Sequence, residues 1–260
     1  MNSLEEKDYK AFIEHYKKAT GIDLNLYKEK QMKRRFKTLR DKLGFDSFDA
    51  LAVAMVQDED IKQQFLEKMT INVSEFYRNK ERWDYLGQHI LPEMYKDRQR
   101  PLRIWSAACS TGEEPYTIAM IMKKQRIRAN ILATDVDATV LAAARKAIYK
   151  PHVIKQVPKE ELDAYFVESA NFWELSTSAL PQVEFRLHDL LKDSYPSQQD
   201  LIICRNVCIY FTEEAKDGVY QRFADALTKG GLLFVGSTEQ IFRPERYGFK
   251  HEGHFFYRKL

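Results

Sequence analysis

The sequence predicts a small all-α domain followed by a larger α/β domain with a mostly parallel sheet. Up to about residue 70, apolar residues recur at helical spacing and no convincing strand is found. From Leu102 onward, short apolar runs alternate with helical segments, which is typical of strands that pair in parallel. A length of 260 residues accommodates one large α/β domain and a smaller companion, each with its own core.

The composition excludes several classes of protein. With 44% hydrophobic and 30% charged residues, the chain is neither disordered nor fibrous. Its first residues lack the apolar stretch of a signal sequence, and no apolar run is long enough to span a bilayer. The three cysteines, Cys109, Cys204 and Cys208, form neither a disulfide framework nor a complete zinc-ligand pattern. We therefore expect a cytoplasmic protein that has no metal site and does not insert into a membrane.

The two parts of the chain have distinct local patterns. We assign residues 1–75 to the helical domain, in which Gly21 and Gly44 separate helical segments. Residues 76–100 are predicted to be a linker, and residues 101–260 form the α/β domain. The apolar runs that predict its strands are 102–105, 131–134, 183–187, 201–204 and 232–235.

The segment Tyr27–Lys42 predicts a basic amphipathic helix. Its apolar positions are Met32, Phe36, Leu39 and, one residue further on, Leu43. The basic residues on the remaining faces are Lys30, Lys33, Arg34, Lys37 and Arg40. Such a face is either merely solvated or contacts an acidic partner, and the pattern alone leaves both interpretations open. The net charge of +3 is too small for the whole surface to attract nucleic acid.

In open α/β sheets, ligands bind beyond the carboxyl ends of the strands. The first predicted strand is followed by small residues and then by Gly112, Glu113, Glu114 and Pro115, a pattern that lets a ligand approach the backbone before a helix begins. The dinucleotide and P-loop signatures are absent, and two carboxylates would repel a pyrophosphate. A cationic ligand such as S-adenosylmethionine is favoured, although either glutamate could simply be a charge at a helix N-terminus.

Three further strand ends carry polar residues. Asp135 follows the second run, where a carboxylate can accept both ribose hydroxyls of an adenosine, but an aspartate there is also a common helix N-cap. Asp189 follows the third run, where it can accept from an adenine amino group. The fourth run leads into Arg205–Phe211, which places polar groups beside aromatic ones. We expect these four ends to converge on one pocket.

Three segments carry a more specific signal: Thr70–Arg78 (TINVSEFYR), Trp105–Tyr116 (WSAACSTGEEPY) and Cys204–Phe211 (CRNVCIYF). With these motifs in this order, the chain resembles the bacterial chemotaxis receptor glutamate methyltransferases, the CheR family, over essentially its full length. The resemblance implies an N-terminal all-α domain and a class I S-adenosylmethionine-dependent methyltransferase domain with a Rossmann-like fold. It also implies a small inserted antiparallel β subdomain at about 150–181.

The resemblance also implies roles for individual residues. Asn72, Ser74 and Arg78 would help to close over the cofactor, and Arg78 and Tyr210 would lie beside the transferred methyl group. The cofactor pocket would be lined by Glu114, Asp135, Asp189, Leu190, Cys204 and Arg205. Without the resemblance, Arg78 would be interpreted as a surface charge and Tyr210 as a core aromatic residue.

The implied reaction transfers a methyl group from S-adenosylmethionine to glutamate side chains of methyl-accepting chemotaxis receptors. Its products are glutamate 5-O-methyl esters and S-adenosylhomocysteine. A glutamate side chain is already ionised at neutral pH, so the reaction needs no general base. The methylated region of such receptors is an acidic helical bundle, which gives the basic helix a partner, with Lys33, Lys37 and Arg40 as candidate contacts. We expect a monomer that binds the cytoplasmic region of the receptors.

Some residues depart from the family pattern. Cys109 stands where alanine-like residues are usual, and His188-Asp189 replaces a version that contains asparagine. The stretch Phe166–Val183 lacks the glycine-rich turn of members that bind a receptor's C-terminal pentapeptide, which favours docking without that tether. Two alternatives are a methyltransferase of another acceptor, such as RNA, and a non-catalytic module that binds cofactor and receptor. The presence of Arg78 and Tyr210 favours an enzyme, and we expect no nucleic-acid partner.

Overall fold

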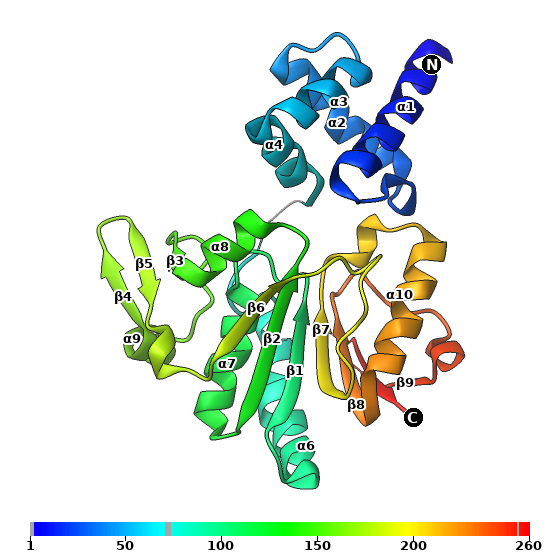
Figure 1. Cartoon of the computed structure of the whole chain (residues 1–260). Coiled ribbons are helices and arrows are strands. Elements are labelled where there is room, and N and C mark those ends of the chain that lie inside the picture. Colours follow the sequence, from blue (N-terminus) through cyan, green and yellow to red (C-terminus); the bar gives the residue numbers. More distant parts are fainter. Residues whose placement is uncertain (1–2, 71–73, 254) are drawn as a thin grey trace. The chain divides into compact units, whose positions relative to one another are not determined.

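The computed structural model describes residues 3–70, 74–253 and 255–260. The chain forms two compact units, of which the first comprises Met1–Asn72 and Tyr210–Gly218 and the second Val73–Ile209 and Val219–Leu260. Figure 1 shows the helices and strands of each unit, many of them labelled. No helix within the described residues is long and apolar enough to cross a membrane.

The N-terminal part of the first unit is all-α, as predicted. Its elements are α1 (Ser3–Thr20), η1 (Leu24–Leu26), α2 (Glu29–Leu43), α3 (Phe48–Gln57) and α4 (Glu59–Thr70). Gly44 ends α2 in the left-handed conformation, and the Ser47 side chain caps α3 by accepting from the Ala50 N–H. Phe12, Phe36 and Phe65 pack together within the helical core with ring centroids 4.0–5.9 Å apart. These local signals and this aromatic core explain why the segment is helical.

The segment Tyr210–Gly218 completes the first unit, although it lies within residues 101–260, which we assigned to the α/β domain. The Lys28 N–H donates to the Tyr210 carbonyl at 2.8 Å, and the Thr212 N–H donates to the Leu26 carbonyl at 2.9 Å. The ring of Phe211 packs edge-on against Tyr27 with the centroids 5.3 Å apart. Tertiary contacts join this segment to the helices, and no local sequence pattern predicts these contacts.

The second unit is built on a seven-stranded sheet with the order β6-β2-β1-β7-β8-β10-β9. Its strands are β1 (Leu102–Ala107), β2 (Ala129–Asp135), β6 (Val183–Leu187), β7 (Gln199–Cys204), β8 (Leu227–Val235), β9 (Phe249–His251) and β10 (Phe256–Lys259). The first five pair in parallel, whereas β10 pairs antiparallel with β8 and β9. All five apolar runs that were predicted to be strands form strands. The two C-terminal strands, β9 and β10, were not predicted. The strand order changes direction between β1 and β7, which is where ligands bind in such sheets.

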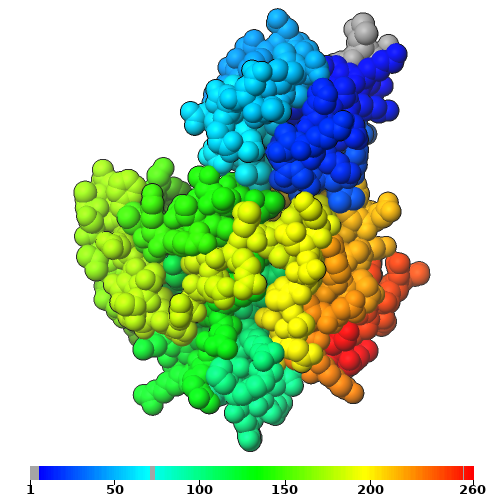
Figure 2. All heavy atoms as spheres, in the orientation of Figure 1, coloured from blue at the N-terminus to red at the C-terminus, as the bar shows by residue number. Residues whose placement is uncertain are grey.

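The remaining elements connect these strands and include the expected antiparallel insertion. The helices are α7 (Glu113–Gln125), α8 (Ala138–Lys146), α9 (Lys159–Tyr165) and α10 (Glu213–Ala226), with the short segments η3 (Thr177–Ala179), η4 (Cys208–Tyr210) and η5 (Pro244–Tyr247). A second sheet, in the order β3-β5-β4, contains β3 (Ile148–Tyr149), β4 (Phe166–Ser169) and β5 (Phe172–Leu175). The inserted segment occupies one side of the second unit (Figure 2). The predicted fold class is confirmed.

Residues 76–100 differ from the expected linker. They form α5 (Lys80–Tyr85), the π-helical segment η2 (Leu86–Ile90) and α6 (Leu91–Arg98). Trp83 and Leu86 are at most 1% exposed and belong to the main core of the second unit. Burial of these large apolar side chains is the physical reason why the segment is an integral part of that unit.

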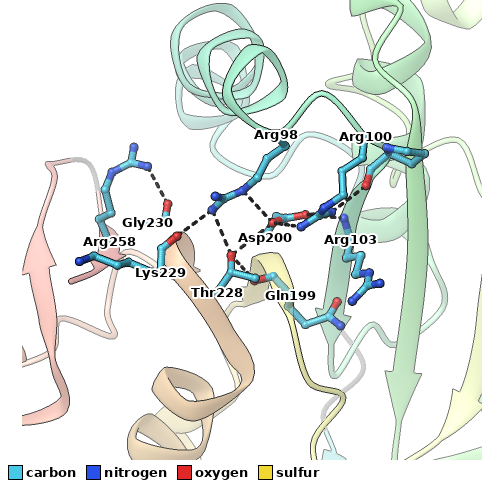
Figure 3. A network of polar contacts seen from close by, with 10 residues as sticks. Arg98, Arg100, Arg103, Gln199, Asp200, Thr228, Lys229, Gly230 and Arg258 are labelled. Carbon is cyan, nitrogen blue, oxygen red and sulfur yellow. Dashed lines mark hydrogen bonds and ion pairs between the residues drawn. The ribbon is translucent and has the colours of Figure 1, made fainter.

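A buried carboxylate joins the amino ends of three strands (Figure 3). Asp200, at the start of β7, is fully buried and accepts from both Nη atoms of Arg100 at 2.8 and 2.9 Å. The Arg103 N–H donates to Asp200 at 2.9 Å, and Arg98 Nε lies 3.0 Å from the other carboxylate oxygen. Thr228, near the start of β8, also donates to Asp200. The network lies at the amino ends of the strands and leaves the carboxyl ends for the site.

Candidate functional site

The loop after β1 is tightly folded. Ala108, Ser110 and Gly112 all have positive φ angles, of 62°, 49° and 93°. A Cβ atom on Gly112 would lie 2.9 Å from the Cβ of Ala144, so only glycine fits at this position. The Cys109 N–H donates to the Thr134 carbonyl at 2.9 Å, which ties the loop to β2.

The Glu114 carboxylate lies beside this loop, and nearby groups compensate its negative charge only in part. One of its oxygens accepts from the Ser106 hydroxyl at 2.8 Å, and the other lies 3.9 Å from Arg205 Nη1. Burial raises the pKa of Glu114 to about 7, because the charge of Arg205 offsets the loss of solvent only in part. A largely buried carboxylate of this kind gains from a cationic ligand, so Glu114 fits the ammonium or sulfonium of S-adenosylmethionine.

Asp135 ends β2 and is only 5% exposed. Its Oδ2 accepts from the Ser110 N–H at 2.8 Å, and its Oδ1 accepts from the Asp137 N–H at 3.1 Å. Burial raises its pKa to about 6 although both N–H groups oppose the rise. Asp137, not Asp135, caps α8, by accepting from the Thr139 N–H at 2.8 Å. The helix-cap interpretation therefore applies to Asp137, and both oxygens of Asp135 keep further lone pairs for ribose hydroxyls.

The loop after β6 is tied to the same edge of the sheet. The His188 N–H donates to the Asp135 carbonyl at 2.9 Å. Asp189 is half-buried, accepts from the Leu191 N–H at 2.8 Å, and has a pKa raised by burial. Leu190 is buried, and its carbonyl accepts from the Tyr195 hydroxyl at 2.8 Å. The predicted adenine-side residues are thus held next to β2.

Ser74 is connected to the β1 loop through Glu113. Its side chain hydrogen-bonds to the Glu113 carboxylate, which also accepts from the Thr111 hydroxyl at 2.8 Å. Glu113 is 3% exposed, and burial raises its pKa. Glu113 therefore holds the incoming segment as well as starting α7, a role that sequence reasoning left open. Asn72, predicted to act with Ser74, lies outside the described residues.

Arg78 lies in a strained turn that is held from several sides. Its neighbours Tyr77 and Asn79 have φ angles of 54° and 61°, and each such non-glycine residue costs about 1–3 kcal/mol. The Arg78 carbonyl accepts from Trp83 Nε1 at 3.1 Å and from Arg205 Nη2 at 2.7 Å. A strained backbone conformation persists only where several surrounding contacts hold it in place, and the Arg78 turn has such contacts.

Arg205 is turned toward that segment and away from solvent. Its side chain is 4% exposed, and burial lowers its pKa. Its Nη2 also donates to Asn79 Oδ1 at 2.9 Å, and its guanidinium lies over the rings of Trp83 and Phe234, 5.3 and 4.8 Å from their centroids. These contacts assign the guanidinium to the Arg78 turn and Glu114, whereas its predicted contact with the cofactor stays a prediction. Cys204, also predicted at the cofactor, is fully buried at the end of β7.

Glu239 is a site residue that sequence reasoning missed. It is 4% exposed and accepts from the N–H groups of Asn206, Val207 and Gly236. A Cβ atom on Gly236 would lie 2.5 Å from Glu239 Oε2, so this contact requires glycine. Glu239 thereby ties the loop after β7 to the loop after β8. The Gly236-Ser-Thr-Glu239 sequence directly after a strand was the signal that could have revealed it.

The remaining predicted residues belong to the first unit. Tyr210 is half-buried there, with the Arg35 guanidinium 4.7 Å from the centre of its ring. On α2, Lys33 Nζ lies 5.2 Å from the centre of the Tyr9 ring, and Arg40 bonds to Asp41 and stacks on Phe48. Of the three predicted partner contacts, only Lys37 is exposed.

The exposed part of the basic helix therefore differs from the predicted set. Lys30, Arg34 and Lys37 are all exposed and follow one another at helical spacing. Helix periodicity turns Lys33 and Arg40 partly toward the neighbouring helices, which the sequence pattern did not resolve. Within residues 3–70, 74–253 and 255–260 no group of three or more histidine, cysteine or acidic side chains is arranged to hold a metal ion.

Comparison with known proteins places both parts of the chain. Residues 7–70 match the family model "CheR methyltransferase, all-alpha domain", and residues 72–254 match "CheR methyltransferase, SAM binding domain". The chain is 41% identical over 256 residues to the chemotaxis protein methyltransferase of Listeria monocytogenes, a match that covers 98% of each chain. It is 32% identical over 248 residues to chemotaxis protein methyltransferase 1 of Pseudomonas aeruginosa, over 90% of each chain. The chemotaxis protein methyltransferase of Salmonella typhimurium is 31% identical over 233 residues, a match that covers 85% of this chain and 79% of that one.

Proposed function

The chain belongs to the CheR methyltransferase family, and from this premise we propose that it methylates glutamate side chains of methyl-accepting chemotaxis receptors. It is an S-adenosylmethionine-dependent methyltransferase that acts in chemotaxis. The observation that carries the proposal is a pair of carboxylates whose charge is only partly compensated: the largely buried Glu114 in the first turn of α7, and the buried Asp135 at the end of β2. They suit a ligand that combines a cationic group with a ribose diol.

The residues around these carboxylates fit S-adenosylmethionine. Glu114 would face its cationic methionyl part, Asp135 its ribose hydroxyls, and Asp189 with Leu190 its adenine. When bound, the cofactor supplies an electrophilic methyl group on a sulfonium that leaves as a neutral thioether. Among the described residues the buried Ser110 hydroxyl has no hydrogen-bond partner, which supports a polar ligand at this loop.

The acceptor side needs orientation more than acid–base chemistry. A glutamate side chain has an ordinary pKa of about 4.3 and is therefore anionic at neutral pH. The Arg78 guanidinium can orient such a carboxylate through paired hydrogen bonds, and the contacts of its carbonyl hold the turn that presents it. Its motif assigns Tyr210 to the same step, as the residue that confines the acceptor.

Recognition of the receptor is proposed to use α2. Its exposed residues Lys30, Arg34 and Lys37 form a basic face, and the methylated region of such receptors is acidic. Complementary charge of this kind steers association and is sensitive to salt. The esterified product carries one negative charge fewer, so methylation alters the electrostatics of the receptor that is recognised.

The decisive experiment incubates the full chain with S-adenosylmethionine labelled in the methyl group and with receptor-containing membranes. We expect label on the receptor that is released by mild base as methanol, because carboxyl methyl esters hydrolyse readily. Base-resistant label, or label on RNA, would instead identify another acceptor. Cofactor binding without any transfer would identify a non-catalytic module.

The same assay tests Arg78. We expect Arg78→Ala to lower turnover by at least about tenfold, equivalent to about 1.4 kcal/mol in the barrier. Arg186→Ala is the matched control, because Arg186 is exposed on β6 and pairs with the exposed Glu184. Full turnover by the Arg78→Ala enzyme would remove Arg78 from the mechanism.

A further inference from the structure

We propose that Tyr77 and Glu161 are positioning residues that hold the Arg78 turn and couple it to the inserted subdomain. The proposal rests on the proposed function in one respect, namely that Arg78 acts in methyl transfer. It concerns a contact between two parts of the second unit that lie 84 residues apart in the sequence. Neither residue was singled out by the sequence patterns.

On the side that follows Arg78, side chains of the second unit hold the turn. Arg205 and Trp83 donate to the Arg78 carbonyl, and Arg205 also donates to the Asn79 side chain. These contacts fix the turn on the side that follows Arg78. They leave the left-handed conformation of Tyr77, on the other side, to be held by different partners.

Tyr77 is held by two contacts of its own. Its N–H donates to the Thr117 hydroxyl of α7 at 3.2 Å, and its phenol hydroxyl donates to the Glu161 carboxylate of α9. Both Tyr77 and Glu161 are at most 5% exposed. The Glu161 carboxylate also accepts from Lys124 Nζ of α7 at 3.2 Å, so it is fixed from two directions. A fixed, buried acceptor can locate the Tyr77 ring and, through it, the backbone of the next residue.

The chemistry of this pair keeps it intact over the working pH range. Burial and the nearby Glu161 charge raise the pKa of the Tyr77 hydroxyl, which therefore stays a donor. The pair also borders a cavity of about 200 Å³ that is lined by Lys80, Asp84 and Gly87 among others. Water can approach from this cavity, so removal of the hydroxyl alone need not collapse the surrounding packing.

The position of Glu161 links the inserted subdomain to the Arg78 turn. Glu161 lies on α9, between β3 and β4 of the inserted antiparallel sheet. Any displacement of α9 moves the acceptor of the Tyr77 hydroxyl, and Tyr77 is covalently adjacent to Arg78. The inserted subdomain is thereby connected to the residue that orients the acceptor carboxylate, rather than being only an appendage on the sheet.

The test compares four variants of the full chain in the labelled-methyl assay, with kcat and KM measured separately. Tyr77→Phe and Glu161→Leu each remove the contact, and we expect kcat to fall about threefold to tenfold. We expect KM for S-adenosylmethionine to change less than about twofold, since Glu114 and Asp135 are untouched. Glu161→Gln keeps an acceptor oxygen and should recover most of kcat. The Tyr77→Phe/Glu161→Leu double variant should be no slower than the slower single variant, because both lose one shared contact.

Asp163→Asn is the matched control, because it changes an exposed carboxylate on the same helix as Glu161, and it should keep full kcat. A purely structural contact would lower the amount of folded enzyme and leave kcat per folded molecule unchanged, which would overturn the proposal. So would single-variant losses that multiply in the double variant. Arg78→Ala is assayed alongside. If it is fully active, the assigned role of Arg78 fails, whereas an impaired Arg78→Ala with an unimpaired Tyr77→Phe refutes only the positioning contact.

Discussion

At the scale of single residues, Glu114 and Asp135 dominate the electrostatics of the site. Asp135 is buried and Glu114 is largely buried, and the loss of solvent raises their pKa values to about 6 and about 7, respectively. Each carboxylate has hydrogen-bond donors, and the Arg205 guanidinium, 3.9 Å from Glu114, replaces the lost solvent only in part. Binding of a cationic ligand therefore gains most when Glu114 has lost its proton.

We predict that affinity for S-adenosylmethionine rises between about pH 6 and about pH 7.5, by about five- to tenfold, as Glu114 ionises. Glu114→Gln should bind more weakly and should lose most of this pH dependence. Isothermal titration calorimetry at several pH values measures both effects. An unchanged pH profile in the variant would show that Glu114 does not face the cationic group.

The same residue affects the stability of the ligand-free protein. Because the folded-state pKa of Glu114 lies above its ordinary value of about 4.5, its stabilising contribution is complete below that value. The contribution is lost as pH rises through about 7. Urea unfolding of the ligand-free chain should therefore show stability falling over this window, and the fall should be smaller in Glu114→Gln.

At the scale of elements, α2 has two kinds of basic residue. Lys33 and Arg40 contact the aromatic rings of Tyr9 and Phe48 within the first unit. Lys30, Arg34 and Lys37 are exposed. The first pair contributes to the helical packing, whereas the second set forms the exposed basic face of the helix.

We predict that reversing Lys30, Arg34 and Lys37 together to glutamate weakens receptor binding by at least about tenfold at low salt. S-adenosylmethionine affinity and the thermal midpoint should change little. Lys33→Glu and Arg40→Glu should instead lower the thermal midpoint. Binding to receptor membranes at two salt concentrations, with calorimetry of each variant, separates the two effects. Equal receptor binding by the triple variant would exclude this face as the docking surface.

The Asp200 network acts at the amino ends of the strands. Burial on its own would raise the pKa of Asp200, but the hydrogen bonds from Arg100 and the Arg103 N–H and the nearby arginine charges hold it below its ordinary value. The stabilisation from this carboxylate is therefore present at neutral pH and is lost as pH falls through the lowered pKa. It ties α6 and the first residues of β1, β7 and β8 together.

We predict that Asp200→Asn lowers the free energy of unfolding by about 1.5–3 kcal/mol at neutral pH, since it removes the charged acceptor of the partly exposed Arg98 and Arg100. Asp163→Asn, at an exposed pair with Lys159, should cost less than about 1 kcal/mol. Urea titration of both variants measures the difference. Turnover per folded molecule should be unchanged in Asp200→Asn, because the site lies at the opposite ends of the strands.

At the scale of the whole molecule, the proposed cofactor contacts on described residues fall in one compact unit. Ser74, Glu114, Asp135, Asp189 and Arg205 all belong to the second unit. The first unit contributes the basic helix and the segment Tyr210–Gly218. Cofactor binding should consequently stabilise one unit directly.

We predict that S-adenosylmethionine at a hundred times its dissociation constant stabilises the folded chain by about 2.7 kcal/mol. In hydrogen exchange, added protection should centre on the loops after β1, β2 and β6. Asp135→Asn should reduce this protection, whereas Asp163→Asn should not. Protection confined to α1–α4 would place the cofactor elsewhere.

The sequence by itself determined the order of helices and strands and the residues at the strand ends. Hydrophobic periodicity indicates local structure, and parallel strands bring their carboxyl ends to one edge of a sheet. Glu114, Asp135 and Asp189 could therefore be predicted to lie near that edge. The motifs around Arg78 and Cys204 further indicated the family. These signals are local in the chain or follow from strand polarity.

Only the tertiary structure decided how the site is held. The bond from Arg205 to the Arg78 carbonyl joins residues 127 positions apart, and the Tyr77–Glu161 contact spans 84. The inclusion of Tyr210 in the first unit and the burial of Trp83 likewise depend on packing between distant segments. Periodicity shows which face of an element is apolar but not which element covers it, so these contacts had to be observed.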